Sequence, residues 1–205
     1  MTICLSDAGK RFNRDWIFRH FNHHFEAGKS YAITGANGSG KSTLLQCLSG
    51  SMMLNEGDIS YMRAEKTIAA EKIYAEVSIC APYLETVEEM TVREFLEFHK
   101  TFKPFLNSIS TDAIIAAVGL EKAANKQIRY YSSGMKQRVK LAQCIFSNTA
   151  VVLLDEPCTN LDKTGIALYH SLVDTYCKNR LVVVSSNDEV EYEFCDERIA
   201  MSTYK

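Results

Sequence analysis

The sequence lacks the segments that place a protein in a membrane. No apolar run approaches the roughly 20 residues that a bilayer-spanning helix needs. The first residues, Met1-Thr2-Ile3-Cys4-Leu5, have neither the charged segment nor the apolar stretch of a signal peptide. We therefore expect a soluble, cytoplasmic protein.

Excess charge and paired cysteines are also missing. The net charge of -2 gives no general affinity for nucleic acid or anionic membranes, so we expect no nucleic-acid partner. The seven cysteines are scattered without a C-x-x-C pair, which argues against a disulfide framework or a zinc site. There are no internal repeats, and 205 residues of which 46% are hydrophobic suffice for one domain with a core.

The strongest pattern present is a glycine-rich segment that fits G-x-x-x-x-G-K-[ST]. It lies between a predicted strand, Ser30–Thr34, and a predicted helix that starts near Thr43. In such a loop, backbone N–H groups and the positive end of the helix hold phosphates. Lys41 adds a positive charge, and Ser42 offers Mg²⁺ an oxygen ligand. The predicted nucleotide-binding residues are Gly35, Ala36, Asn37, Gly38, Ser39, Gly40, Lys41, Ser42 and Thr43.

The rest of the chain reads as alternating strands and helices. Residues 1–34 alternate apolar and polar and predict short strands, with further strands at 59–62 and 77–80. From Thr91 the period becomes helical, and Thr91 with Glu94 forms a predicted capping box. A second helix is expected at 111–118. Residues 82–131 therefore read as a helical insert.

The second half returns to strand and helix. The apolar runs 151–154 and 181–184 fit parallel strands buried on both faces, with a crossover helix at 163–178 between them. The predicted fold is α/β, with a mostly parallel central sheet and helices on both sides. Together with the phosphate loop it resembles a P-loop NTPase, which implies an N-terminal antiparallel β part. We expect a single domain, 1–205, whose core (1–81 and 132–205) carries a helical subdomain at 82–131.

Two carboxylates follow the first of these runs. Asp155 and Glu156 stand at the carboxyl end of a predicted central strand, where open α/β sheets bind ligands. Asp155 can hold Mg²⁺ together with Ser42, and Glu156 can take the proton of a water that attacks a terminal phosphate.

A third pattern, Tyr-Ser-Ser-Gly-Met-Lys-Gln-Arg at residues 131–138, opens a predicted helix upstream of that strand. Ser132 is a good N-cap, and Ser133 and Gly134 leave backbone N–H groups open to a second anion.

With these three patterns in this order, the chain resembles the ATP-binding subunits of ABC transporters nearly end to end. The phosphate loop resembles the Walker A motif, residues 151–156 the Walker B motif, residues 131–138 the family signature, and residues 159–162 the D-loop. The resemblance implies head-to-tail dimers, homo- or heteromeric, that close over two ATP molecules with Mg²⁺. Ser132, Ser133 and Gly134 of one subunit would then face the ATP held by the other.

The resemblance also raises the question of which aromatic residue stacks on adenine. Phe12 matches the expected place upstream of the phosphate loop, with Trp16 as a rival. The alternative interpretation makes Phe12 a core aromatic of the first hairpin.

Two positions depart from the family pattern. Asn187 stands where the family usually has a histidine that contacts the γ-phosphate. An amide donates hydrogen bonds but carries no imidazolium charge, so we expect slow hydrolysis. The usual glutamine after the strand at 77–80 is missing, and Tyr83 and Glu85 are both candidates to replace it.

The resemblance implies an ATPase that powers a separate membrane-spanning permease subunit and lies at the inner face of the cell membrane through it. The signature and the short chain resemble exporter-type subunits, including the haem-exporter ATPase of cytochrome c biogenesis. Two alternatives stay open: a soluble ABC-type ATPase that acts as a mechanical switch in a cytosolic complex, and an ATP-gated regulator that hydrolyses slowly.

Overall fold

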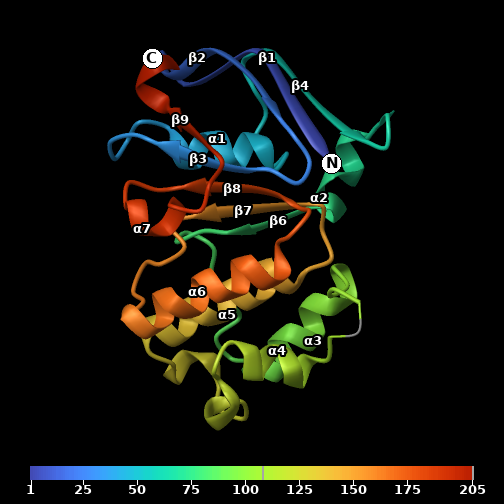
Figure 1. Cartoon of the computed structure of the whole chain (residues 1–205), viewed down its shortest axis with the longest axis vertical. Coiled ribbons are helices and arrows are strands. Elements are labelled where there is room, and N and C mark those ends of the chain that lie inside the picture. Colours follow the sequence, from blue (N-terminus) through green and yellow to red (C-terminus); the bar gives the residue numbers. More distant parts are fainter. Residues whose placement is uncertain (108, 205) are drawn as a thin grey trace. The chain divides into compact units, whose positions relative to one another are not determined.

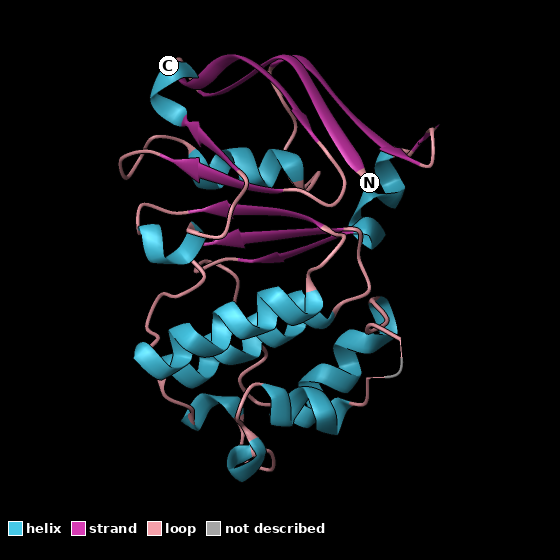
Figure 2. Ribbon diagram, viewed as in Figure 1, coloured by secondary structure: helices cyan, strands magenta, loops and turns pink. Residues whose placement is uncertain are grey.

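The computed structural model describes residues 1–107 and 109–204, which group by their contacts into two units. The first unit comprises residues 1–79, 149–156 and 179–205, and the second comprises residues 80–148 and 157–178. Figures 1 and 2 show the strands and helices of both.

The first unit contains two sheets. An antiparallel sheet has the strand order β2-β1-β4-β5, with β1 Thr2–Phe12, β2 Asp15–Phe25, β4 Glu56–Arg63 and β5 Lys66–Thr67. The five-stranded sheet has the order β6-β7-β8-β3-β9. Its strands are β6 Val77–Cys80, β7 Val151–Asp155, β8 Leu181–Ser185, β3 Ser30–Thr34 and β9 Glu197–Ala200.

Parallel pairing joins β7 to β8, β8 to β3, and β3 to β9. Every residue of β7 and β8 is buried, which explains why both read as unbroken apolar runs. Side chains of β1, β2, β3 and helix α1, Lys41–Leu48, share one hydrophobic core with β7 and β8. The predicted α/β class, the parallel sheet and the antiparallel N-terminal part are confirmed.

The second unit is helical. It contains α3 Val92–Phe102, α4 Thr111–Ala117, α5 Ser133–Phe146 and α6 Lys163–Tyr176, together with the single 3₁₀ turns Glu121–Ala123 and Ile128–Tyr130. The capping box at Thr91 and Glu94 is present, and Ser110 caps α4. Helices α5 and α6 contact each other and lie side by side (Figure 1).

By its contacts, the helical unit includes more residues than the predicted insert at 82–131. Helix α5 packs against α3, α4 and α6, so the contacts place α5 and α6 with the helices and not with the sheet. The division predicted from the sequence into 1–81, 82–131 and 132–205 stays a prediction.

Several short elements escaped the sequence analysis. They are α2 Ile73–Glu76, α7 Glu189–Tyr192, β5, β9 and the 3₁₀ turns Ala70–Lys72 and Met201–Tyr204. Strand β9 buries only Ile199 of its four residues, so it shows no apolar run. Within residues 1–107 and 109–204, no helix has the length and apolar character needed to cross a bilayer.

Candidate functional site

The phosphate loop lies between β3 and α1, as the sequence predicts. Helix α1 begins at Lys41, and its N-cap, Gly40, makes no side-chain capping bond. The first N–H groups of an uncapped helix are open donors, and they carry the positive end of the helix dipole. The start of α1 is therefore an anion-binding geometry.

Gly40 cannot be replaced without strain. Its φ is +99°, and an added Cβ would lie 2.5 Å from Cγ2 of Ile17. Only glycine combines this left-handed backbone with such a close approach at little cost. The β2 residue Ile17 thus packs against the loop, a role that no sequence motif indicated.

A hollow of about 340 Å³ lies over this loop within the first unit. Lys41 is only 5% exposed, and its Nζ donates to the carbonyl oxygens of Gly35 (2.7 Å) and Ala36 (3.4 Å). The ammonium group is therefore held against the loop's own carbonyls, where an anion can share it. The residues around the hollow are Ile17, Asn37, Gly38, Ser39, Gly40, Lys41, Ser42, Thr43 and Glu156.

Asp155 ends β7 with its side chain 2% exposed. Its Oδ1 is buried and has no hydrogen-bond partner within the described part of the chain. Its register partner on β8, Ser185, is fully buried, and the Ser185 Oγ likewise lacks a partner among the described residues. Buried oxygens are costly unless a donor, water or cation satisfies them. This pair of orphaned oxygens fits a bound Mg²⁺ and its waters.

Glu156, the next residue, has a φ of +45°. A non-glycine residue in this left-handed region is strained, and such strain gathers at functional sites. The Glu156 N–H donates to the Ser185 carbonyl at 2.9 Å, which holds this backbone in place, and Glu156 borders the phosphate hollow. The structure thus brings the predicted base to the predicted phosphate loop.

Asn187 lies beside the loop as well. Its Nδ2 donates to Oδ1 of Asn37 at 2.9 Å, although 150 residues separate the two in the chain. The sequence analysis named both residues but did not predict that they bond.

Phe12 is 47% exposed, so its alternative interpretation as a core aromatic is wrong. Trp16 lies against Gly9 with the Arg19 guanidinium 4.2 Å from the centre of its ring. Neither aromatic borders the phosphate hollow, and the adenine-stacking role of Phe12 stays a prediction.

The signature segment lies in the helical unit. The Ser132 hydroxyl accepts a hydrogen bond from the Met135 N–H at 3.3 Å and caps α5 as predicted. A Cβ on Gly134 would lie 2.9 Å from the Asn160 carbonyl oxygen, so the D-loop backbone approaches α5 too closely for a side chain there.

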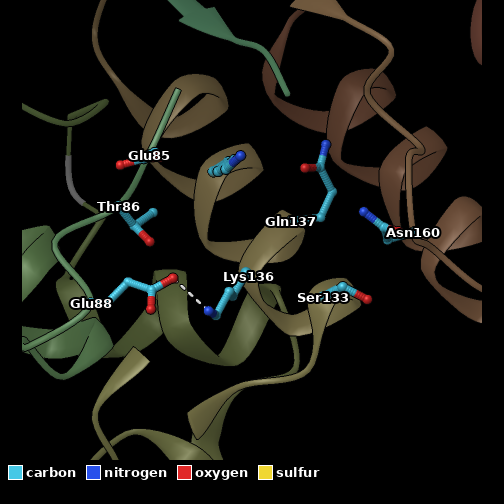
Figure 3. A pocket seen from close by; sticks show the side chains of 8 residues that line it. Glu85, Thr86, Glu88, Ser133, Lys136, Gln137 and Asn160 are labelled. Atoms are coloured by element: carbon cyan, nitrogen blue, oxygen red, sulfur yellow. Dashed lines mark hydrogen bonds and ion pairs between the residues drawn. The ribbon is translucent and has the colours of Figure 1, made fainter. Parts of the chain in front are cut away.

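A second hollow, of about 470 Å³, opens beside Ser133 in this unit (Figure 3). Lys136 pairs with Glu88 at 2.5 Å, and Lys140 donates to the Pro82 carbonyl at 3.0 Å. Buried Gln137 donates to the Pro157 carbonyl at 2.7 Å, a role missed from the sequence. Glu85 borders this hollow, but both Glu85 and Tyr83 stay candidates for the missing glutamine.

The chain matches proteins of one family over nearly its whole length. The family model described as ABC transporter matches residues 18–159. An uncharacterised ABC transporter ATP-binding protein of Bacillus subtilis is 29% identical over 94% of this chain and 89% of its own. The cytochrome c biogenesis ATP-binding export protein of Agrobacterium fabrum is 30% identical over 96% of this chain and 94% of its own.

Solved structures show the same fold. A putative ABC transporter ATP-binding protein from Pyrococcus furiosus has a TM-score of 0.83, with 20% identity over 100% of both chains. A bacterial Atm1-family ABC exporter with ATP bound has a TM-score of 0.81, with 18% identity over 97% of this chain and 37% of its own. With its phosphate loop, paired carboxylates and signature helix, this chain belongs to the ABC transporter family as an ATP-binding subunit.

Proposed function

We propose that this chain binds Mg-ATP, dimerises head to tail around it, hydrolyses it and thereby drives a separate membrane-spanning permease subunit. The observation that carries the proposal is the hollow in which Lys41, Ser42 and Glu156 meet, with the orphaned carboxylate oxygen of Asp155 at the end of β7. Under this proposal the protein works in the cytoplasm, at the inner face of the membrane through its permease.

Each residue has a role in the hydrolysis of ATP to ADP and phosphate. The N–H groups at the start of α1 and Lys41 hold the β- and γ-phosphates. Ser42 and Asp155 are the proposed Mg²⁺ ligands, and the ion neutralises charge on the phosphates when bound. Glu156 accepts the proton of the attacking water. Ser132, Ser133 and Gly134 would complete the site of a partner subunit.

Relatives named as export proteins support an exporter as the class of transporter. The polar hollow beside Ser133 in the helical unit offers exposed Glu85, together with lysines held by neighbours, to a permease.

The decisive variant is Glu156→Gln, which removes the base and keeps the shape. We expect ATP turnover to fall by about 10²–10⁴-fold, the usual contribution of general base catalysis, while ATP still binds. The tagged variant, isolated from its native host in detergent with Mg-ATP, should carry a multi-span membrane protein that mass spectrometry identifies. Soluble partners alone, or a bare homodimer, would contradict the transporter role and favour a cytosolic switch.

Asn187 favours a second candidate, a regulator that closes on ATP and hydrolyses it slowly. We expect Asn187→His to raise turnover, because an imidazolium stabilises charge on the γ-phosphate better than an amide does. If Asn187→His bound ATP normally but its turnover were unchanged or lower, Asn187 would not be what makes hydrolysis slow.

A further inference from the structure

The hydrogen bond between Asn187 and Asn37 connects the loop after β8 to the turn of the phosphate loop. The donor is the Asn187 amide, and the acceptor is the side-chain carbonyl of Asn37, 2.9 Å away. Asn37 borders the phosphate hollow, so the bond holds the Asn187 amide next to a residue of that rim.

The backbone around Asn187 is firmly anchored. The Ser186 N–H donates to the Ile33 carbonyl at 3.2 Å, which ties this segment to the strand that leads into the phosphate loop. The Ser186 hydroxyl accepts from the Asp188 N–H at 2.9 Å, and Asp188 caps α7. Asn187 is therefore presented from a fixed support.

Asn37, in contrast, stands on a tight and open turn. The Ser39 N–H donates to the Ala36 carbonyl at 3.0 Å, and a Cβ added to Gly38 would meet nothing within 4 Å. Asn37 and Gly38 are both exposed. The amide of Asn187 thus holds the open end of the loop from outside it.

The Asn187 side chain has a second hydrogen-bond donor besides the one that binds Asn37. A side-chain amide nitrogen carries two hydrogens, and the bond to Asn37 uses one of them. Asn187 is exposed, and its second N–H has no partner within the described part of the chain. The residue that accepts its first N–H, Asn37, borders the hollow that we assign to the phosphates.

We propose that Asn37 is a positioning residue that orients Asn187 so that its second N–H reads the terminal phosphate of a nucleoside triphosphate. The inference rests on the proposed function and adds to it a side-chain partner for Asn187. Asn37 acts through Asn187, and its own side chain does not need to touch the nucleotide.

The test measures the preference for ATP over ADP, as the ratio of the two dissociation constants from binding titrations. Every variant is made in the Glu156→Gln background so that hydrolysis does not interfere. Asn187→Ala should lower this preference by about tenfold or more, because it removes a hydrogen bond to a charged group. Asn37→Ala should lower it by about fivefold, because an Asn187 side chain that is no longer held must be ordered when the triphosphate binds. ADP affinity should stay unchanged in both.

The double variant separates positioning from independent effects. If Asn37 acts through Asn187, Asn37→Ala/Asn187→Ala should match Asn187→Ala alone. Asn125→Ala, a change at an exposed asparagine of the helical unit, is the matched control and should leave the preference intact. Three outcomes would overturn the inference while leaving ATP binding by the chain in place. The double variant could lose preference by the product of the two single losses, Asn37→Ala could keep its preference for ATP, or a variant could lose affinity for ATP and ADP equally. A chain that binds neither nucleotide would overturn the proposed function as well.

Discussion

At the carboxyl ends of β7 and β8, the buried oxygens of Asp155 and Ser185 have no partner among the described residues, whereas three side chains of the hollow beside Ser133 in the helical unit are held by their neighbours. Lys136, Gln137 and Lys140 each reach a carboxylate or a carbonyl of that same unit. An unsatisfied buried site is stabilised by a ligand, while a satisfied polar surface is preorganised for another protein. This difference supports our proposal that the first unit binds the nucleotide and that the helical unit contacts another protein.

Lys41→Ala should give the largest effect among the tests of this comparison. We expect ATP affinity to fall about 10–100-fold, because one charge-assisted hydrogen bond to phosphate is lost. Isothermal titration calorimetry would measure the ATP affinity. The matched control, Lys140→Ala, removes a lysine from the helical unit's hollow and should leave ATP affinity unchanged. Similar losses of ATP affinity in both variants would contradict the assignment of nucleotide binding to the first unit.

A smaller effect is expected from acid, through a half-buried histidine of the helical unit. His99 bonds to the Ser147 hydroxyl at 2.8 Å, and burial, with a smaller contribution from Lys103, lowers the pKa of His99 to about 4. An unfolded histidine has a pKa near 6.5, so between pH 6.5 and 4 the unfolded chain binds the extra proton. The free energy of unfolding should therefore fall as the pH drops through this range.

The His99→Gln variant should lose that dependence, which we expect to be about 1 kcal/mol between pH 7 and pH 4.5, because solvent screens part of the shift at this half-buried group. Urea midpoints at the two pH values would measure it. His20→Gln changes an exposed histidine of the first unit and serves as the control. If the free energy of unfolding of His99→Gln still fell with pH as in the unaltered protein, the acid sensitivity would arise from another group.

Ser132→Ala should have the smallest effect on folding, about 1 kcal/mol, through loss of the cap of α5. Ser110→Ala removes the matching cap of α4 and should cost a similar amount. Equilibrium unfolding measures both. Only Ser132→Ala should also slow ATP turnover, since only Ser132 belongs to the signature. Equal slowing by both variants would mean that the signature acts through helix stability alone.

Local patterns predicted much of the fold. The buried runs became β7 and β8, the Thr91–Glu94 box caps α3, and Ser132 caps α5. These signals lie within a few residues of one another in the chain. Strand β9 was missed because it buries a single side chain, and its pairing with β3 depends on residues more than 160 positions away.

The same limit applies to the site. The phosphate loop and Asp155-Glu156 carry motifs, so their types and spacing indicate their chemistry. Ile17, Ser185 and the bond from Asn187 to Asn37 carry none, because each matters only through a neighbour that tertiary folding brings to it. Gln137 stood inside the signature, but its contact with the Pro157 carbonyl depends on packing within the helical unit.

The left-handed backbone of Glu156 sets stability against activity at a single residue. Glycine would relax that conformation, so a screen for heat resistance alone should favour a glycine at position 156. Such a screen would select against the carboxylate that we assign to the chemistry. A glutamate in so unfavourable a backbone is what selection for turnover, and not for thermal stability, would leave behind.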